Sequence, residues 1–392
     1  MNQYLAVGLL SGTSLDGVDA ALCRIALPED EDDPLTETTI DIEAFRTETY
    51  GASFRSTLES CCAGEASPET VARTSIAVAD RFARATMRLL EEASVAPEEV
   101  DVIGSHGQTI WHAPTPKPVP GTDRRSRVTV QIGDGAVVAR ETRIDTVADF
   151  RAADVAAGGH GAPLSPLFDW IQFGDESEDR IVQNIGGIGN CTILPRGGDR
   201  SAVTAFDTGP GNMVIDAVVQ SLTDGERRYD EDGALAAAGT VDETLLAELL
   251  EDPFFDRKPP KSTGRERFGR DYAVRVLERA RVRGLEDADI VATVTALTSA
   301  SIVDAYDRHT SVDPDRVILS GGGAWNGTLV SMLDDALSCP VQPSRDRGID
   351  PDSREAALFA LLGTLFDAGR TGNVPTVTGA SHQVVLGKHT KA

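Results

Sequence analysis

Residues 4–19 have the sequence YLAVGLLSGTSLDGVD, an apolar segment that enters a glycine turn carrying hydroxyl and carboxylate groups. Apolar runs at 20–27 and 39–45 follow, which predicts a strand, a turn and two further strands in antiparallel order. Glycine lets a turn approach a ligand closely, and successive backbone N–H groups form a concavity that binds anions. This corner of the fold is therefore a candidate phosphate site.

The same pattern recurs further along the chain. A strand at 180–184 enters a turn at Gly186 and Gly187, and a strand at 316–320 enters Gly321–Gly323. A single triple glycine is as often a tight strand-to-helix turn, but three such turns, each after a strand, favour a phosphate site. The other elements expected are strands at 100–103, 128–132 and 142–147, and helices from Ser67-Pro68 onward and at 212–222, 242–250, 288–308 and 355–368.

The charge balance excludes some classes of partner. The net charge is −25, from 62 acidic and 37 basic residues, and only five residues are lysine. Such a surface repels phosphate backbones and anionic membranes, so we expect no nucleic acid and no membrane as partner. The composition favours a halophilic source, whose salt screens the repulsion between carboxylates; an ordinary acidic cytosolic enzyme is the alternative.

The compartment is indicated by the cysteines and by the lack of export signals. No apolar run approaches the roughly 18–20 residues that span a membrane, and Met1–Leu10 lacks the basic flank of a signal peptide. The cysteines are odd in number and have neither zinc nor redox spacing. We therefore expect reduced thiols and a cytoplasmic protein.

Motifs along nearly the whole chain resemble one family in unbroken order. Gly8–Ala20 is similar to the first motif of the anhydro-N-acetylmuramic acid kinases. Further segments resemble the family's later motifs: GSHGQT at 104–109, VQIG at 130–133, DFR at 149–151, GGHGAPL at 158–164, NIGGIGN at 184–190, FDTGPGN at 206–212, KSTGRE at 261–266, GGGAWN at 321–326 and VTGA at 377–380.

The resemblance implies the α/β fold shared by sugar kinases, Hsp70 and actin. We expect two RNase H-like domains of the actin/hexokinase type with a central cleft, one formed by residues 1–149 with 375–392 and the other by residues 150–374. The resemblance also implies ATP, Mg²⁺ and hydrolytic opening of a 1,6-anhydro sugar with phosphorylation of its 6-oxygen. We expect a homodimer with a small sugar as substrate.

The nucleotide site is predicted from the glycine turns. The first turn supplies Gly12, Thr13, Ser14, Leu15, Asp16, Gly17, Val18 and Asp19, with Asp16 and Asp19 holding hydrated Mg²⁺. From the second domain we expect Asn184, Gly186, Gly187 and Asn190 at the β- and γ-phosphates, and Gly321, Gly322 and Gly323 at adenine or ribose. The alternatives are a hairpin with surface acids, a strand-to-strand turn and a tight strand-to-helix turn.

Asp207 is the candidate general base. The water that attacks the anomeric carbon must lose a proton, and a carboxylate beside a glycine-proline turn suits that task. The family resemblance places the catalytic aspartate in this motif. The alternative is an aspartate that caps the helix after Gly211.

Candidate sugar contacts are Thr109, Asp149, Arg151 and Glu355, because a polyol needs hydroxyl and charged partners. Thr109 could instead be a turn hydroxyl, and Glu355 a helix-start residue. His106 is interpreted as structural. The polar loop containing Lys261 and Arg265 is expected to close over the nucleotide or to shape a dimer contact.

One departure from the family concerns the substrate. Ala152 and Ala153 follow Arg151 where the family usually has arginines, and His160 stands where it usually has Gln. An arginine grips a carboxylate well, so we expect weaker discrimination for the lactyl carboxylate of muramic acid. Two alternatives stay open: a kinase of another anhydrosugar without that carboxylate, and an ATP-driven conformational switch.

Overall fold

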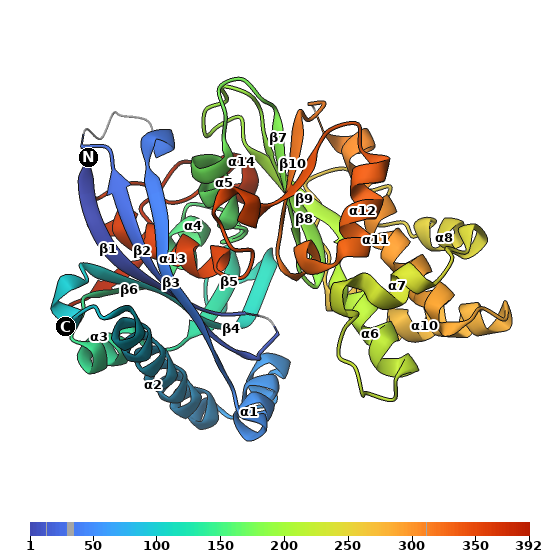
Figure 1. Cartoon of the computed structure of the whole chain (residues 1–392). Helices are drawn as coiled ribbons and strands as arrows, with labels where there is room; N and C mark the ends of the chain where they lie inside the picture. The colour runs from blue at the N-terminus through green and yellow to red at the C-terminus, as the bar shows by residue number, and fades with distance from the viewer. Residues whose placement is uncertain (13, 30–34, 311) are drawn as a thin grey trace. The chain divides into compact units, whose positions relative to one another are not determined.

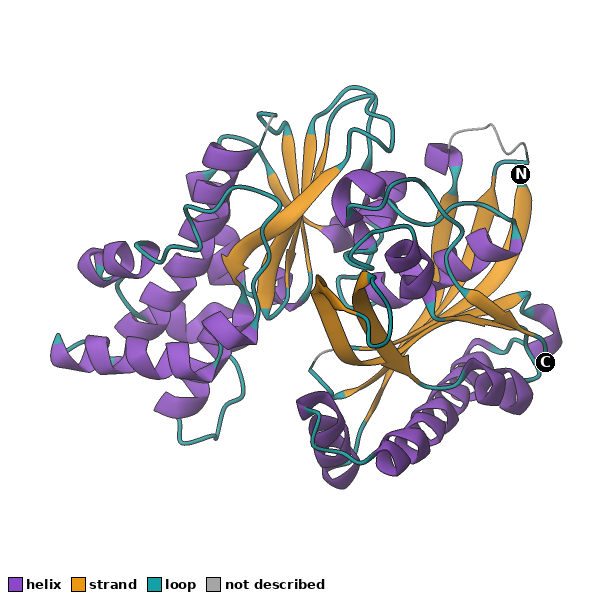
Figure 2. Ribbon diagram, turned by 180° about the vertical axis from the view of Figure 1, so that it is seen from behind, coloured by secondary structure: helices purple, strands orange, loops and turns teal. Residues whose placement is uncertain are grey.

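The computed structural model describes residues 1–12, 14–29, 35–310 and 312–392, coloured along the chain in Figure 1. The chain forms two compact units. The first contains Met1–Gln172 together with Ser353–Ala392, and the second contains Phe173–Asp352. Each unit has its own mixed sheet with helices packed on it (Figure 2).

The sheet of the first unit begins with an antiparallel meander, β3–β2–β1, and continues through parallel pairing of β1 with β4 and of β4 with β6. β5 pairs with β4, and β12 pairs with β6. The strands are β1 (Asn2–Ser11), β2 (Gly17–Leu27), β3 (Thr39–Thr49), β4 (Val102–Pro118), β5 (Arg125–Ile132), β6 (Thr146–Ala148) and β12 (Lys388–Thr390).

The helices of the first unit are α1 (Ala52–Ala63), α2 (Pro68–Ala93), α3 (Gly135–Thr142), α4 (Phe150–Ala156), α5 (Ser165–Phe173), α13 (Arg354–Asp367) and α14 (Pro375–Thr378). Of these, α2 and α13 pack directly on the sheet. On β1, Leu5, Val7 and Leu9 share a core with α2. A Cβ on Gly8 would lie 1.8 Å from the carbonyl oxygen of Ala356, so glycine is what lets α13 lie directly on the sheet.

The sheet of the second unit repeats the same order, β9–β8–β7–β10–β11. β7, β8 and β9 are antiparallel, and β10 pairs in parallel with both β7 and β11. The strands are β7 (Arg180–Ile185), β8 (Ile188–Leu194), β9 (Thr204–Pro210), β10 (Arg316–Ser320) and β11 (Val341–Pro343). This order is that of an RNase H-like domain, so the predicted fold class, an α/β protein with two such domains, is confirmed.

The second unit contains a long, largely buried helix, α11 (Asp287–His309). Its other helices are α6 (Asn212–Leu222), α7 (Ala234–Ala238), α8 (Glu243–Leu250), α9 (Arg265–Phe268), α10 (Arg270–Val282) and α12 (Gly327–Ala336). α11 packs against α6, α7, α8 and β9. It is apolar and long enough to cross a membrane, which corrects the expectation that no such run exists, but 67% of its apolar stretch is buried inside the protein. It is a core helix.

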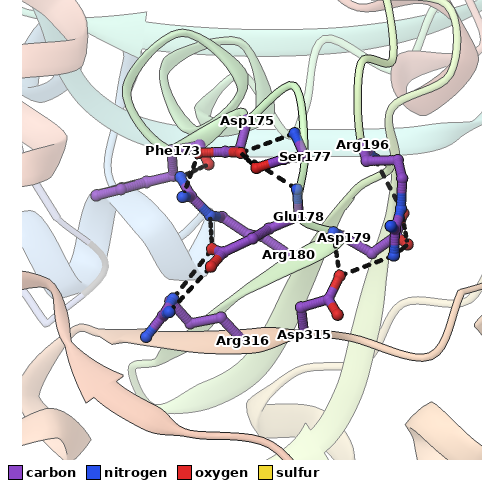
Figure 3. Close-up of polar contacts among 9 residues, drawn as sticks. All are labelled: Phe173, Asp175, Ser177, Glu178, Asp179, Arg180, Arg196, Asp315 and Arg316. Atoms are coloured by element: carbon purple, nitrogen blue, oxygen red, sulfur yellow. Dashed lines mark hydrogen bonds and ion pairs between the residues drawn. The ribbon is translucent and has the colours of Figure 1, made fainter.

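Ion pairs join the strand starts of the second unit (Figure 3). Glu178, just before β7, accepts from Arg180 at 2.8 Å and from Arg316 of β10 at 3.0 Å. Arg196, which follows β8, contacts Asp179 at 2.6 Å and Asp315 at 2.9 Å. The network ties the loops before β7 and β10 together at the sheet end opposite the glycine turns.

The boundaries of the units differ from those expected from the sequence. Residues 150–172 and 353–374, including α4 and α13, belong to the first unit. The reason lies in long-range packing: α13 rests on β1 and β4, and the buried Arg354 pairs with the buried Asp169. The strand and turn patterns of the sequence do not reveal such long-range contacts.

Candidate functional site

The turn between β1 and β2 is anchored at its base by buried hydrogen bonds. The hydroxyl of Ser11 donates to Oε1 of Gln108 at 2.5 Å and accepts from the hydroxyl of Tyr50 at 3.0 Å. The amide of Gln108 also donates to the carbonyl of Thr109 at 3.1 Å. The end of β1 is therefore held by β4 and by the residue that follows β3.

The predicted nucleotide residues of this turn divide into two kinds. Leu15 and Val18 are buried in the core, so they can offer a ligand only their backbone. Asp16 is exposed and accepts from the hydroxyl of Ser14 at 2.6 Å, whereas Asp19 is half-buried and accepts from Thr47 at 2.6 Å. Gly12 is half-buried and Gly17 is buried within β2. Thr13 lies outside the described residues.

The predicted sugar contacts come from separate segments of the first unit. Thr109 is on β4 and accepts from the amide of Gln131 at 3.1 Å. Asp149 follows β6, pairs with Lys388 and lines a cavity of about 330 Å³ with His106 and Gln131. Glu355 is exposed at the start of α13. Thr109, Arg151 and Glu355 do not line that cavity, so Asp149 is the one predicted sugar contact that faces it.

Arg151 and His106 form a hydrogen-bonded pair beneath this region. The Nε of Arg151 donates to Nε2 of His106 at 3.0 Å, and its Nη1 donates to the carbonyl of Gly161 at 2.7 Å. Burial, followed by the charge of Arg151, lowers the pKa of His106 well below its ordinary value. The ring of His106 also lies tilted against the ring of Phe359, with the ring centres 4.6 Å apart. These contacts agree with the interpretation of His106 as structural.

Arg151 keeps its charge in this environment. Burial lowers the pKa of Arg151 to about 10, against the opposing charges of Glu355 and Asp154. A guanidinium with that pKa stays protonated at neutral pH. It can therefore serve as a cationic contact for a substrate.

Asp154 is a residue that the sequence analysis did not single out. It is fully buried and accepts from the backbone N–H of Gly161 at 2.8 Å, from the hydroxyl of Thr378 at 2.7 Å and from the amide of Asn373 at 2.8 Å. It joins α4, the loop at 158–161 and the C-terminal segment. The sequence gives no signal for this role because the partners lie 219 and 224 residues away.

Three glycine segments of the second unit meet at one place. The backbone N–H groups of Gly211 and Asn212 donate to the carbonyls of Gly187 and Gly186 at 3.0 and 2.8 Å. The side-chain amide of Asn212 donates to the carbonyl of Ile185 at 3.2 Å. The start of α6 is thus pinned to the turn between β7 and β8.

Glycine is required where these segments touch. A Cβ on Gly211 would lie 2.3 Å from the carbonyl oxygen of Gly186, and a Cβ on Gly323 would lie 2.3 Å from Ile185. Gly321 has φ +74°, and its Cβ would lie 2.5 Å from Oδ1 of Asn184. Gly322 follows in the same turn. The predicted residues Asn184, Gly186, Gly187 and Gly321–Gly323 therefore lie together.

Asp207 lies beside this cluster on β9. Asn190 of β8 pairs with Asn184 of β7 on one side and with Asp207 on the other, so the three occupy adjacent strands in register. The carboxylate of Asp207 accepts from the backbone N–H of Thr263 at 2.8 Å. The cap of α6 is Gly211, with no side-chain bond, which excludes the alternative that Asp207 caps this helix.

The environment of Asp207 is electrostatically unusual. Burial raises the pKa of Asp207 to about 6, against the N–H of Thr263 and the ammonium group of Lys261, which favour the ionised form. Lys261 is buried, with its Nζ 4.8 Å from the centre of the Phe254 ring. The loop at 261–265 therefore holds Asp207, a role that the sequence analysis did not give it.

A second carboxylate of this unit is also perturbed. Burial raises the pKa of Asp216 to about 7, against the charge of Arg228. Asp216 lies on α6 and lines a cavity of about 640 Å³ with Met213 and Arg270. Its only sequence signal is its place on the helix that follows the glycine turn. Among the described residues, no group of three or more His, Cys, Asp or Glu side chains is placed to hold a metal ion.

Comparison with known proteins assigns the chain to a family. Residues 4–392 match the family model described as anhydro-N-acetylmuramic acid kinase. Curated proteins with that name are 44% identical in Caldanaerobacter subterraneus (98% of this chain, 96% of the relative) and 44% identical in Salinibacter ruber (98% and 96%). A relative in Gloeobacter violaceus is also 44% identical (99% and 98%). The chain therefore belongs to the anhydro-N-acetylmuramic acid kinase family and is a carbohydrate kinase.

Proposed function

We propose that the protein uses ATP and water to convert 1,6-anhydro-N-acetylmuramic acid into N-acetylmuramic acid 6-phosphate and ADP, a step of cell-wall sugar recycling. Family membership supports the substrate, since relatives of nearly equal length carry that name. The observation that carries the chemistry is the half-buried carboxyl of Asp207, whose pKa is raised to about 6 next to the convergent glycine turns.

Asp207 acts as the general base. The oxygen of a water molecule bonds to the anomeric carbon, and its proton passes to the carboxylate of Asp207. The bond between that carbon and the 6-oxygen breaks, and the 6-oxygen forms a bond to the γ-phosphorus as ADP leaves. A base with a pKa near 6 is ionised at neutral pH and still takes a proton readily.

The glycine turns position the nucleotide. Phosphoryl transfer asks a protein mainly for positioning and charge neutralisation. We assign the polyphosphate to the turn at Gly12–Asp19 and to Asn184, Gly186, Gly187 and Asn190, and the nucleoside to Gly321–Gly323. The support within the second unit is that these segments meet beside Asp207.

Asp16 and Asp19 fit a hydrated magnesium ion. Asp16 is exposed and Asp19 is half-buried, and each carboxylate is oriented by one hydroxyl donor. Mg²⁺ usually keeps several waters and binds through one or two carboxylates plus phosphate oxygens. When bound, the ion supplies neutralisation of the phosphate charge.

The sugar is assigned to Thr109, Asp149, Arg151 and Glu355. Arg151 stays charged and is fixed by two hydrogen bonds, so it offers an oriented guanidinium. Asp149 faces a cavity, where its carboxylate can accept from a sugar hydroxyl. Glu355 is exposed and its charge acts on Arg151, which places the two near each other.

The cellular setting is part of the proposal. No disulfide joins Cys23, Cys61, Cys62, Cys191 and Cys339, all of which the structure describes, and this suits a reducing cytoplasm. The net charge of −25 suits a halophilic cell. We also propose a homodimer. Light scattering coupled to gel filtration, in concentrated KCl, tests that state: a monomer at micromolar concentration contradicts it.

The experiment for the reaction is mass spectrometry of the product made in H₂¹⁸O, together with the rate of ADP release. We expect one ¹⁸O at the anomeric carbon and phosphate on the 6-oxygen. Asp207→Asn should keep ATP binding and lose about 10²–10⁴ in turnover, as expected when a general base is removed. Asp256→Asn, at an exposed carboxylate, is the matched control. Near-normal turnover in Asp207→Asn would show that another group takes the proton.

A further inference from the structure

Two arginines of the first unit hold a loop that carries a histidine. Arg127 of β5 donates from Nη1 to the carbonyl of Gly158 at 2.8 Å and from Nε to the carbonyl of Pro114 at 2.9 Å. Arg151 of α4 donates to the carbonyl of Gly161 at 2.7 Å. The guanidinium groups therefore hold the two ends of the loop that carries His160. All three side chains are half-buried.

His112 of β4 adds a fourth basic group. Its Nδ1 lies 3.2 Å from the hydroxyl of Thr129 on β5. Burial, followed by the charges of Arg151 and His160, lowers the pKa of His112. Burial, followed by the charge of Arg127, lowers the pKa of His160, and Asp154 opposes this effect. The four basic groups thus act on one another and form one cluster, Arg127, Arg151, His112 and His160.

The two arginines of this cluster make no direct ion pair among the described residues, although the composition offers many carboxylates. The chain has 62 acidic residues against 37 basic ones. Yet across residues 1–12, 14–29, 35–310 and 312–392, neither Arg127 nor Arg151 forms an ion pair with a carboxylate, and both donate to neutral groups instead. The charges of Glu355 and Asp154 act on Arg151 without forming an ion pair with it. Glu355 is exposed, and the buried Asp154 is already engaged by Gly161, Asn373 and Thr378. Unpaired guanidinium groups in so acidic a protein indicate a site for an anion.

The position of the cluster in the fold indicates which anion it binds. Arg151 belongs both to the cluster and to the proposed sugar contacts. Thr129, the partner of His112, lines the cavity of about 330 Å³ together with Asp149. We propose that Arg127, with Arg151 and His160, binds the carboxylate of the sugar substrate and sets the preference for it. The inference rests on the proposed function, which supplies a sugar bearing a lactyl carboxylate.

The chemistry of Arg127 suits this role. Its Nε and Nη1 are used by backbone carbonyls, which fix the plane of the guanidinium and leave further N–H groups for a ligand. Two N–H groups of one guanidinium match the two oxygens of a carboxylate. Ala152 and Ala153 add no cation to Arg151 on α4, and Arg127 of β5 supplies the further cation. We therefore expect the acid preference to be kept, in place of the weaker discrimination expected from the sequence.

The test compares kcat/KM for 1,6-anhydro-N-acetylmuramic acid and for the analogue that lacks the lactyl group. Arg127→Gln should lower kcat/KM for the acid about ten- to a hundredfold, the loss expected for one charged hydrogen bond, with the analogue little changed. Arg127→Lys should restore part of that loss because it keeps the charge. His160→Gln should give a smaller loss, again confined to the acid.

The matched control is Arg125→Gln, which removes a neighbouring exposed arginine of β5. We expect it to change neither sugar's kcat/KM. Equal losses for both sugars in Arg127→Gln, or no loss for either, would overturn the inference. The melting temperature of each variant identifies losses caused by unfolding.

The two proposals fail in different ways. A wild-type enzyme that turns over both sugars equally contradicts the carboxylate site and leaves the reaction standing. If wild type turns over neither sugar, the proposed function fails. Calorimetry with the muramic sugar then decides: binding that Arg127→Gln abolishes supports the site, and no binding to wild type overturns it.

Discussion

The carboxyl of Asp207 gains its proton affinity from burial, and its neighbours only moderate that effect. The N–H of Thr263 and the ammonium of Lys261 both favour the ionised form, yet the pKa of Asp207 still lies near 6. Lys261 cannot fully compensate, because burial also lowers the pKa of Lys261 and its Nζ lies over aromatic rings. Such a carboxyl changes its charge within the pH range in which enzymes are assayed.

We predict an acidic limb in the pH profile of kcat/KM. The reaction needs ionised Asp207, so activity should be full above about pH 7 and fall about tenfold per unit below about pH 6. Initial rates between about pH 5 and 8 measure this profile, together with a check at each pH that the protein stays folded.

Asp216, a second acid of this unit with a raised pKa, is the control for assigning the acidic limb to Asp207. Its pKa, raised to about 7, could give a limb of its own. If the limb shifts in Asp216→Asn, it belongs to Asp216. A limb near pH 4, the ordinary range of an aspartate, would contradict the assignment to Asp207.

Among the secondary-structure elements, the start of α6 is built on contact between backbones. Gly211 has no room for a side chain because the carbonyl oxygen of Gly186 would lie 2.3 Å from its Cβ. The contact fixes α6 against the turn between β7 and β8, and so fixes Asn212 near Ile185. The glycine segments at 184–187, 211–212 and 321–323 contact one another and so fix one another's positions.

We predict that Gly211→Ala destabilises the second unit and impairs turnover. Overpacking of this kind costs about 1–3 kcal/mol of unfolding free energy, and displacement of α6 should raise KM for ATP. Urea unfolding and steady-state kinetics measure the two effects. Gly51→Ala, at a position of the first unit with open space around it, is the control and should leave KM for ATP unchanged. Unaltered stability in Gly211→Ala would mean that the turn relaxes without strain.

Much of the fold could be predicted from local pattern. The strand, turn and strand at 4–27 were predicted because apolar runs end at glycine, and β1 and β2 are there. Ser67 caps α2 by accepting from Thr70, as its place before Pro68 predicted. The predicted strand at 142–147 is wrong in part, since Thr142 ends α3 and β6 begins at Thr146.

The rest of the site depends on contacts that local pattern does not carry. Asp207 and the glycine turns were predicted because each has a motif. Asp154 and Arg127 have none: their partners come from the C-terminal segment and from the loop at 158–161. The same holds for α13, which joins the first unit by lying on Gly8 and Gly104. At these residues, partners that are close in space lie far apart in the sequence.

For the whole molecule, the surface charge sets the conditions for stability. The net charge of −25 implies repulsion that favours expansion of the chain. Local ion pairs offset part of it, as in the network of Arg180, Glu178 and Arg316 in Figure 3, where two guanidinium groups and one carboxylate meet. These side chains are mostly shielded from water, with exposed fractions of 8%, 28% and 19%.

We predict that KCl raises the melting temperature, with most of the rise below about 1 M. Screening acts on repulsion between exposed carboxylates, and the Debye length falls from about 10 Å at 0.1 M to about 3 Å at 1 M. The partly shielded pairs of Figure 3 should weaken less than the exposed repulsion is relieved, so the net effect is stabilising. Differential scanning calorimetry from 0.05 to 3 M KCl, at about neutral pH, measures the curve. Sucrose is the control, because it is excluded from protein surfaces without screening charge. A rise that continues linearly to 3 M, or that sucrose matches, would assign the effect to solute exclusion, and a fall with salt would show that the ion pairs outweigh the repulsion.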